Sequence, residues 1–129
     1  MTETVLDPSA LLALLLGEPG GARVGDTLAN AAMTTVNLVE AIAHFTRKGS
    51  CEADIRDMLD PLPISIVPFD QELAYQVGAL LSVTRAAGLS LGDRACLALA
   101  RRLDVPALTA DRAWQAIAAQ VGVRVELIR

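Results

Sequence analysis

Short apolar segments alternate with longer helical segments along the whole chain, and this order strongly limits the folds that it can adopt. The segments between strands are long enough to form crossover helices, which parallel strands require. The pattern therefore predicts an α/β fold of three layers, a mostly parallel central sheet flanked by helices. Segment 64–67 is nearly all apolar and is expected to be buried on both faces. The predicted strands are residues 4–6, 32–34, 64–67, 105–109 and 123–127.

The predicted helices have recognisable start and stop residues. Asp7, which is followed by a proline, suits the start of the first helix, because aspartate caps helices and proline fits their first turn. Ser90 and Asp93 have the S-x-x-D spacing of a capping box. Gly17 ends the first helix. Helices are expected over residues 10–16, 23–31, 35–48, 52–59, 71–87, 91–103 and 112–120.

The composition predicts one domain over residues 1–129 with an aliphatic core. Hydrophobic residues make up 53% of the chain and aromatic residues only 3%, so Ala, Leu, Val and Ile must fill the interior. Trp114 and Tyr75 are expected to be core or interface anchors. Cys51 and Cys96 lack the spacing of a metal site, and we expect both to be small buried hydrophobic residues.

The charge of the chain limits the kinds of partner that it can bind. A formal net charge of −4 argues against a protein that binds nucleic acid through a broad positive field. It is compatible with a nuclease that meets phosphates through metal ions and a few local arginines. No apolar run reaches the ~18 residues of a membrane span, and Glu3 and Asp7 replace the basic start of a signal peptide. These features predict a cytoplasmic protein without membrane contact.

Four acidic residues hold positions from which they could meet at one edge of the sheet. Asp7 follows the first predicted strand, Asp111 follows the fourth, and Asp93 opens a helix. Glu40 lies on the narrow polar stripe of helix 35–48, which is otherwise apolar and is expected to be mostly buried. Ligands of open parallel sheets bind outside the carboxyl ends of the strands.

Two interpretations of these acids remain open on the sequence alone. Each aspartate can be explained as a helix cap or a first-turn acid that favours the helix dipole. Alternatively, the four converge and bind divalent cations, because clustered carboxylates repel one another and oxygen ligands select Mg²⁺ or Mn²⁺. Asn37 either orients Glu40 or a bound water, or bonds to the backbone near the helix start, and His44 is expected to be a satisfied, partly buried histidine. A metal site of this kind is suited to displacement at a phosphodiester.

The order and spacing of these residues resemble a PIN domain, and more narrowly a VapC-type toxin ribonuclease. The resemblance rests on VLDPSALLALLLGEPG, TTVNLVEA and LSLGDRACLALARRLDVPALTAD, and it spans the chain. It implies Mg²⁺- or Mn²⁺-dependent endonucleolytic cleavage of RNA, a homodimer, and a cognate antitoxin that blocks the site. It also implies a catalytic, metal-binding quartet of Asp7, Glu40, Asp93 and Asp111, supported by Ser9 and Thr109.

Further predictions concern substrate contacts and alternative functions. Arg94 and Arg112 directly follow two of the acids, so they are candidate RNA-phosphate contacts, although surface cations are an equal explanation. One alternative function is a PIN-fold binding module that has lost its activity. Another is a phosphatase-like α/β enzyme with Asp7 as nucleophile, but such sites favour D-x-D where this chain has D-P-S.

Overall fold

A five-stranded parallel sheet forms the centre of the molecule in a computed structural model that describes residues 1–129. The strand order is β3-β2-β1-β4-β5, and every neighbouring pair is parallel. The predicted α/β fold with its parallel sheet is therefore confirmed. The strands are β1 (Thr4–Leu6), β2 (Ala31–Thr34), β3 (Ser65–Val67), β4 (Ala107–Thr109) and β5 (Val125–Leu127).

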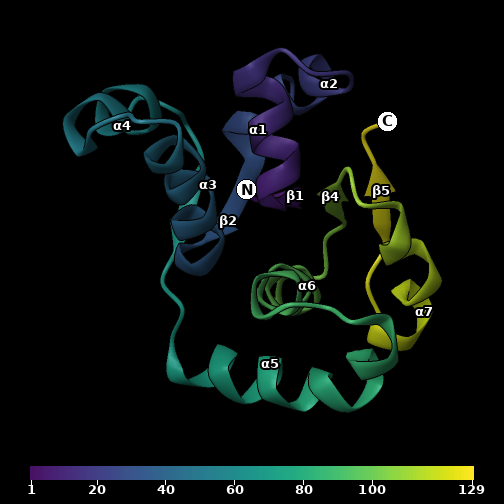
Figure 1. The fold of residues 1–129 in the computed structure, drawn as a ribbon. Coiled ribbons are helices and arrows are strands. Elements are labelled where there is room, and N and C mark those ends of the chain that lie inside the picture. Colours follow the sequence, from purple (N-terminus) through teal and green to yellow (C-terminus); the bar gives the residue numbers. More distant parts are fainter.

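Helices cover both faces of this sheet and complete three layers. Figure 1 shows α5 and α6 on one side of the strands, α1 and α2 on the other, and the α3–α4 pair at one flank. No helix is long and apolar enough to cross a lipid bilayer. The helices are α1 (Pro8–Leu16), α2 (Gly21–Gly25), α3 (Thr35–Arg47), α4 (Glu52–Leu59), α5 (Gln71–Thr84), α6 (Leu91–Leu103) and α7 (Ala118–Val121).

Side chains of the central strands alternate between two hydrophobic clusters, as the two-residue period of a strand requires. Val5 and Ala107 point into a cluster formed with α5, α6 and α7. Leu6 and Leu108 point the other way, into a cluster formed with α1, α2 and α3. Because both faces of β1 and β4 are covered, these strands are fully buried and hold a fixed register.

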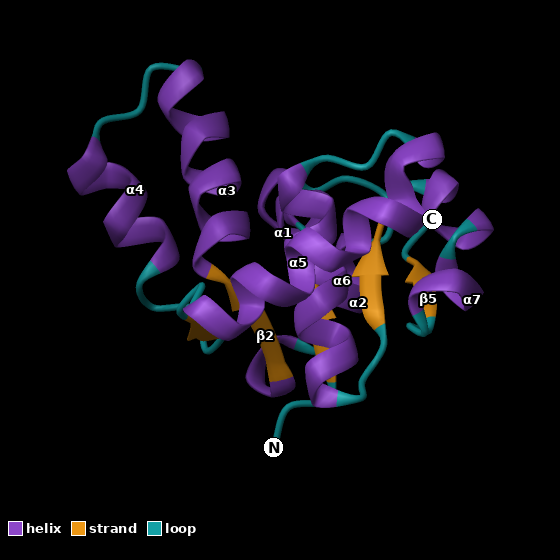
Figure 2. Ribbon diagram, turned by 90° about the horizontal axis from the view of Figure 1, so that it is seen from below, coloured by secondary structure: helices purple, strands orange, loops and turns teal.

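The order in which strands are added across the sheet reverses between β1 and β4. From β1 the chain adds β2 and β3 on one side of the sheet, then returns to add β4 and β5 on the other. Figure 2 shows the strands as the middle layer of the molecule, with helices around them. Such a reversal leaves a crevice at the carboxyl ends of the two strands, where α/β proteins bind ligands.

Two predicted helices are wrong in their extent. Segment 23–31 is not one helix: α2 ends at Gly25, a 3₁₀ turn covers Leu28–Asn30, and Ala31 already belongs to β2. Glycines at both ends of α2 weaken its helical preference. Segment 112–120 is a 3₁₀ helix, Arg112–Ala116, followed by the short α7.

Burial also differs from the prediction at the flank formed by α3 and β3. Strand β3 lies at the edge of the sheet, so Ile66 is 40% exposed and is not covered on both faces. Helix α3 buries only Asn37 and Ala41, and Val39 is 62% exposed. The apolar sequences of α3 and β3 therefore predict more burial than the other elements of this chain provide.

Of the single residues for which the sequence suggested burial, two are buried and two are exposed. Trp114 and Cys96 are buried as expected. Cys51 is exposed at the N-cap position of α4, in the connection that follows α3, and its side chain makes no capping hydrogen bond. Tyr75 is 70% exposed on α5 and is no core anchor.

Candidate active site

Asp7 lies at the carboxyl end of β1 and caps α1. Its Oδ2 atom accepts hydrogen bonds from the Ser9 hydroxyl (2.5 Å) and the Thr109 hydroxyl (3.0 Å). The side chain is almost completely buried, and desolvation raises its pKa from 3.8 to about 6. The two hydroxyl groups act in the opposite direction, and the charge of Asp93 raises the pKa further.

The two hydroxyl groups that orient Asp7 also join β1 to the end of β4. The Ser9 Oγ atom accepts from the Ala110 backbone N–H (3.0 Å), and the Thr109 Oγ1 atom accepts from the Asp111 N–H (3.0 Å). Each hydroxyl proton is thereby directed at Asp7. Asp111 itself is exposed, and its Oδ1 atom caps the following 3₁₀ helix through the Ala113 N–H (3.0 Å).

Glu40 is positioned by Asn37, one turn earlier on α3. The Asn37 Nδ2 group donates both to Glu40 Oε1 (3.1 Å) and to the Gly92 carbonyl at the start of α6 (2.9 Å). The Thr34 hydroxyl donates to Asn37 Oδ1 at 2.7 Å and fixes the amide. Asn37 is fully buried. Its amide both orients Glu40 and bonds to the backbone, so it performs two of the roles that its sequence position left open.

Gly92 allows Glu40 to lie directly against the first turn of α6. A Cβ atom at position 92 would approach Glu40 Oε1 to 1.9 Å. Partial burial raises the pKa of Glu40, the Asn37 hydrogen bond lowers it, and the charge of Asp93 raises it. Gly92 and Thr34 are the site residues that the sequence analysis missed. A glycine inside a helical pattern is the signal that could have indicated close packing at position 92.

Asp93 opens α6 through the predicted capping box, which is confirmed. The Ser90 hydroxyl accepts from the Asp93 N–H (3.1 Å), and Asp93 Oδ2 accepts from the Ser90 N–H (3.0 Å). Its charge reaches both Asp7 and Glu40, since it raises the pKa of each. Beneath them lies Cys96, whose thiol pKa is raised by burial and by the charges of Asp7, Asp93 and Glu40. These three acids therefore share one electrostatic neighbourhood.

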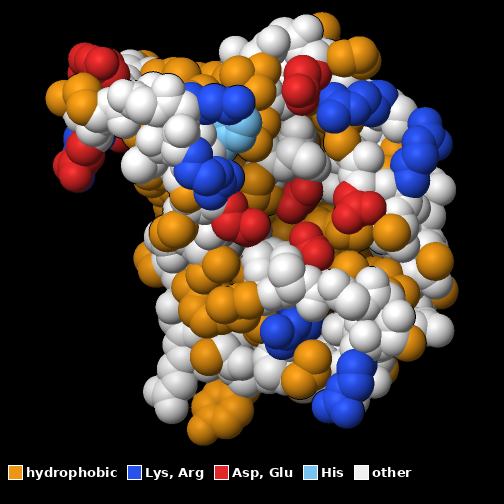
Figure 3. Space-filling view, in the orientation of Figure 1, with side chains coloured by type: hydrophobic (Ala, Val, Ile, Leu, Met, Phe, Trp, Pro, Cys, Tyr) orange, Lys and Arg blue, Asp and Glu red, His pale blue; other side chains and the backbone are white.

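All four predicted acids have one oxygen held by the protein and one without a protein donor. The held oxygens are Asp7 Oδ2, Glu40 Oε1, Asp93 Oδ2 and Asp111 Oδ1. Figure 3 shows acidic side chains gathered in the middle of this face, over the ends of β1 and β4. Oriented carboxylates with free oxygens are the donors that Mg²⁺ and Mn²⁺ prefer, so the donor set fits such an ion.

The side chains of the four acids do not form a complete set of metal ligands. No group of three or more Asp, Glu, His or Cys side chains has an arrangement that could hold a metal ion as it stands. His44 is half-buried and its ring meets Phe45 edge to face, with centroids 5.2 Å apart. Any ion would therefore be bound by the acids after a local rearrangement of their free oxygens.

The two candidate phosphate contacts have different surroundings. The Arg94 Nη1 group donates to the Val77 carbonyl on α5 at 2.9 Å, which ties this side chain to the helix layer. Arg112 is exposed beside Asp111 and makes no hydrogen bond or ion pair with the protein. Of the two, Arg112 has the freedom to meet a phosphate.

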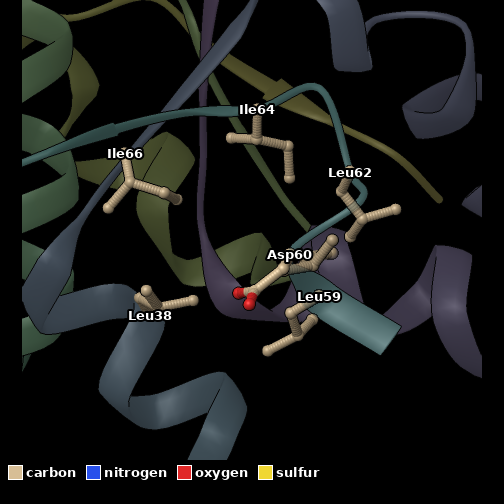
Figure 4. Close-up of a pocket in the computed structure, with 7 residues that line it drawn as sticks. Leu38, Leu59, Asp60, Leu62, Ile64 and Ile66 are labelled. Atoms are coloured by element: carbon tan, nitrogen blue, oxygen red, sulfur yellow. The ribbon is translucent and has the colours of Figure 1, made fainter. Parts of the chain in front are cut away.

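A second surface feature is an apolar hollow at the flank of the molecule. It is bordered by α1, α3, the end of α4 and β3 (Figure 4). Asp60 is the only charged residue on its wall. None of the four acids of the candidate site lines it, so the hollow is a separate surface. Its lining residues are Leu11, Leu38, Leu59, Asp60, Leu62, Ile64 and Ile66.

Comparisons with known proteins agree with this geometry. The family model of the PIN domain matches residues 4–120. A toxin–antitoxin complex from Klebsiella pneumoniae is similar in structure, with a TM-score of 0.75, 18% identity and 98% of each chain covered. So is a DNA-bound VapBC from Salmonella typhimurium, with a TM-score of 0.74, 15% identity and 100% of both chains covered. FitAcB from Neisseria gonorrhoeae aligns with a TM-score of 0.72 at 17% identity over 95% of both chains. No curated protein matches the sequence.

Proposed function

This chain belongs to the PIN domain family, and on that premise we propose that it is a Mg²⁺- or Mn²⁺-dependent endoribonuclease, the toxin of a toxin–antitoxin pair. PIN domains are generally nucleases. The observation that supports the proposal most is the set of four carboxylates, each oriented through one oxygen and free at the other. We treat residues 1–129 as one nuclease domain.

Asp7, Glu40, Asp93 and Asp111 are the residues that would hold the ions. A bound divalent cation would supply an activated water and stabilise the leaving oxygen of the phosphodiester. The protein's own contribution is positioning: Ser9 and Thr109 fix one carboxylate, and Asn37 fixes another. Such supporting hydrogen bonds commonly alter metal affinity or activity 10- to 100-fold when removed, as an order-of-magnitude guide.

The test of this function is Asp93→Asn, with Asp57→Asn as a matched control. The side-chain oxygen of asparagine can still accept from the Ser90 N–H, so the capping box of α6 should be kept. We expect Mg²⁺-dependent cleavage of RNA to fall by about 100-fold or more, and growth inhibition to disappear. Asp57 is exposed on α4 and makes no ion pair, so its substitution should change neither readout. Full activity of Asp93→Asn in both assays would contradict the proposed site.

The apolar hollow is the surface that we assign to the antitoxin. The similar complexes from K. pneumoniae and S. typhimurium are toxin–antitoxin and VapBC assemblies. A toxin that is held inactive needs a stable contact, and an exposed apolar hollow lined by leucine and isoleucine suits an apolar segment of a partner. Leu38→Glu should leave RNA cleavage intact and prevent co-purification with the antitoxin. Undisturbed co-purification would place the antitoxin elsewhere.

We also propose that the chain forms a homodimer. Several large apolar side chains of α3 and α5 are exposed in the single chain, including Val39 (62%) and Tyr75 (70%). Light scattering of the purified protein should give twice the monomer mass. A monomeric mass at high concentration would contradict this part of the proposal.

A further inference from the structure

Helix α3 carries a basic stripe that continues from Glu40 toward its C-terminal end. Glu40, His44 and Arg47 follow one another at spacings of four and three residues, which places them on one side of the helix. Lys48 is the C-cap residue directly after them. Figure 3 shows basic side chains and a histidine together over α3, next to the gathered acids. We call His44, Arg47 and Lys48 the α3 stripe.

The cations of the α3 stripe are not used by the fold. Arg47 and Lys48 are exposed, and neither forms an ion pair or donates a side-chain hydrogen bond to the protein. The acidic start of α4 follows closely in the sequence, yet Glu52 pairs with Arg56 at 2.9 Å instead. The ion pairs of this structure therefore leave two adjacent positive charges free beside the candidate active site.

The helix C-terminus by itself explains the position of these cations only in part. Cations favour this end of a helix because of its dipole. Helix α6 also ends in two arginines, Arg101 and Arg102, and there Arg102 pairs with Asp70 at 3.2 Å. The α3 stripe differs because both of its cations are unpaired and Arg47 shares a helix side with Glu40, a candidate metal ligand. At the end of α6 only Arg101 is unpaired, and its position eight residues after Asp93 places it on a different side of the helix from that acid.

Net charge makes local cations necessary if the substrate is a polyanion. The chain has a formal net charge of −4 and exposes acids at the site itself, so its overall field repels RNA. From Glu40 to Arg47 the helix rises by about 10 Å. With phosphates spaced by roughly 3.4 Å or more along a strand, this distance corresponds to a few nucleotides.

We propose that the α3 stripe binds the phosphate backbone of single-stranded RNA, so that nucleotides on one side of the scissile bond lie along α3. This inference rests on the proposed ribonuclease function and adds to it the direction in which the bound RNA strand extends from the four acids. Arg47 and Lys48 provide the charge contacts. His44, between them and Glu40, offers a ring that can donate to a phosphate or stack against a base.

The experiment compares two double variants that each remove two exposed, unpaired cations. Arg47→Ala with Lys48→Ala disrupts the α3 stripe, whereas Arg101→Ala with Arg124→Ala removes the same charge at the end of α6 and before β5. Binding of a short fluorescein-labelled single-stranded RNA is measured by anisotropy in an Asp93→Asn background, so that the RNA stays intact. Each measurement is repeated over a series of KCl concentrations.

We expect the α3 pair to raise Kd by about tenfold and to make the slope of log Kd against log[KCl] shallower by about 1.4, or ~0.7 for each phosphate contact. The control pair should change Kd by less than about twofold and keep the slope. In the active protein, the α3 pair should raise KM and leave kcat nearly unchanged.

Equal effects of the two pairs would overturn the proposal, since net charge alone would then govern RNA binding. An unchanged Kd for the α3 pair would also overturn it, and normal RNA cleavage by the wild-type chain would then leave the proposed function standing. Conversely, the expected loss of binding together with no Mg²⁺-dependent cleavage by the wild-type chain would support the stripe and refute the ribonuclease.

Discussion

At the scale of single residues, Asp7 carries the clearest sign of a functional role. A carboxylate that served only to cap α1 could remain near the surface, where water would stabilise its charge. Asp7 is instead buried at the junction of β1 and β4, with two hydroxyl groups and a backbone N–H on one oxygen. These bonds do not fully compensate for desolvation, because the pKa is still raised to about 6.

Asp7→Asn should therefore stabilise the metal-free protein. The folded-state pKa lies above the unfolded value, so the native state binds more protons between about pH 4 and 6. The free energy of unfolding consequently falls as the pH rises through that window and stays low above it. At ~1.4 kcal/mol for each pKa unit, the ionised carboxylate opposes folding by about 3 kcal/mol at pH 7.5. An asparagine can keep the oxygen that accepts from Ser9 and Thr109.

Urea denaturation in EDTA measures this effect. We expect Asp7→Asn to raise the free energy of unfolding at pH 7.5 by about 1–3 kcal/mol and to flatten its dependence between pH 4 and 6. The exposed Asp57→Asn variant is the control and should retain the wild-type pH dependence. A destabilised Asp7→Asn protein would show that the carboxylate is structural.

At the scale of elements, the sequence predicted the helices and strands best where capping residues marked their ends. Asp7 and Ser90 cap α1 and α6 as expected, because a side-chain oxygen on a helix N-terminus is a local interaction. Burial was predicted less well. Whether α3 and β3 are covered depends on which element lies beside them, and this is decided by strand order, a non-local property.

The same distinction applies to the candidate site. The positions of Asp7, Asp93 and Asp111 followed from strand ends and helix starts, and that of Glu40 from the polar stripe of its helix. The contact between α3 and α6 did not, because it brings Asn37 and Gly92 together across 55 residues of chain. Only the packed structure reveals that a glycine in one helix makes room for a carboxylate of another.

Gly92→Ala should change the geometry of the site at this contact while leaving the stability of the fold nearly unchanged. The added Cβ would meet the Glu40 carboxylate at 1.9 Å, so the side chain must turn away from Asn37. Stability should change by no more than about 1 kcal/mol, because the carboxylate is flexible and alanine favours a helix. Mn²⁺ affinity measured by calorimetry should fall by about tenfold or more.

Gly78→Ala on α5 is the matched control for this substitution. It also places a methyl group on a helical glycine, and there the new Cβ meets no atom within 4 Å. We expect a slightly more stable protein with unchanged Mn²⁺ affinity. If Gly92→Ala binds Mn²⁺ like the control, Glu40 does not contribute a ligand.

At the scale of the whole molecule, the parallel sheet explains why the acids meet although they are far apart in the sequence. Strands β1 and β4 are neighbours, with Leu6 paired to Leu108, so the residues that follow them lie at one edge of the sheet. Helices α3 and α6 begin at this same edge and bring Glu40 and Asp93 to it. The fold thus concentrates negative charge at one place in a chain that is already negative.

That concentration predicts that divalent cations stabilise the folded chain. The unfolded chain separates the four acids, so an ion binds the native state preferentially and adds about 2.7 kcal/mol at a concentration of 100 Kd. For a chain of this size the melting temperature should rise by about 10 °C, since each kcal/mol shifts it by roughly 4 °C. Differential scanning fluorimetry with MnCl₂ at pH 7.5, above the Asp7 pKa of about 6, measures the shift against EDTA.

Asp93→Asn should lose most of this rise in melting temperature, whereas Asp57→Asn should retain it. Equal melting temperatures in MnCl₂ and EDTA would mean that the acids bind no cation, and that the PIN fold serves here as a binding module without nuclease chemistry.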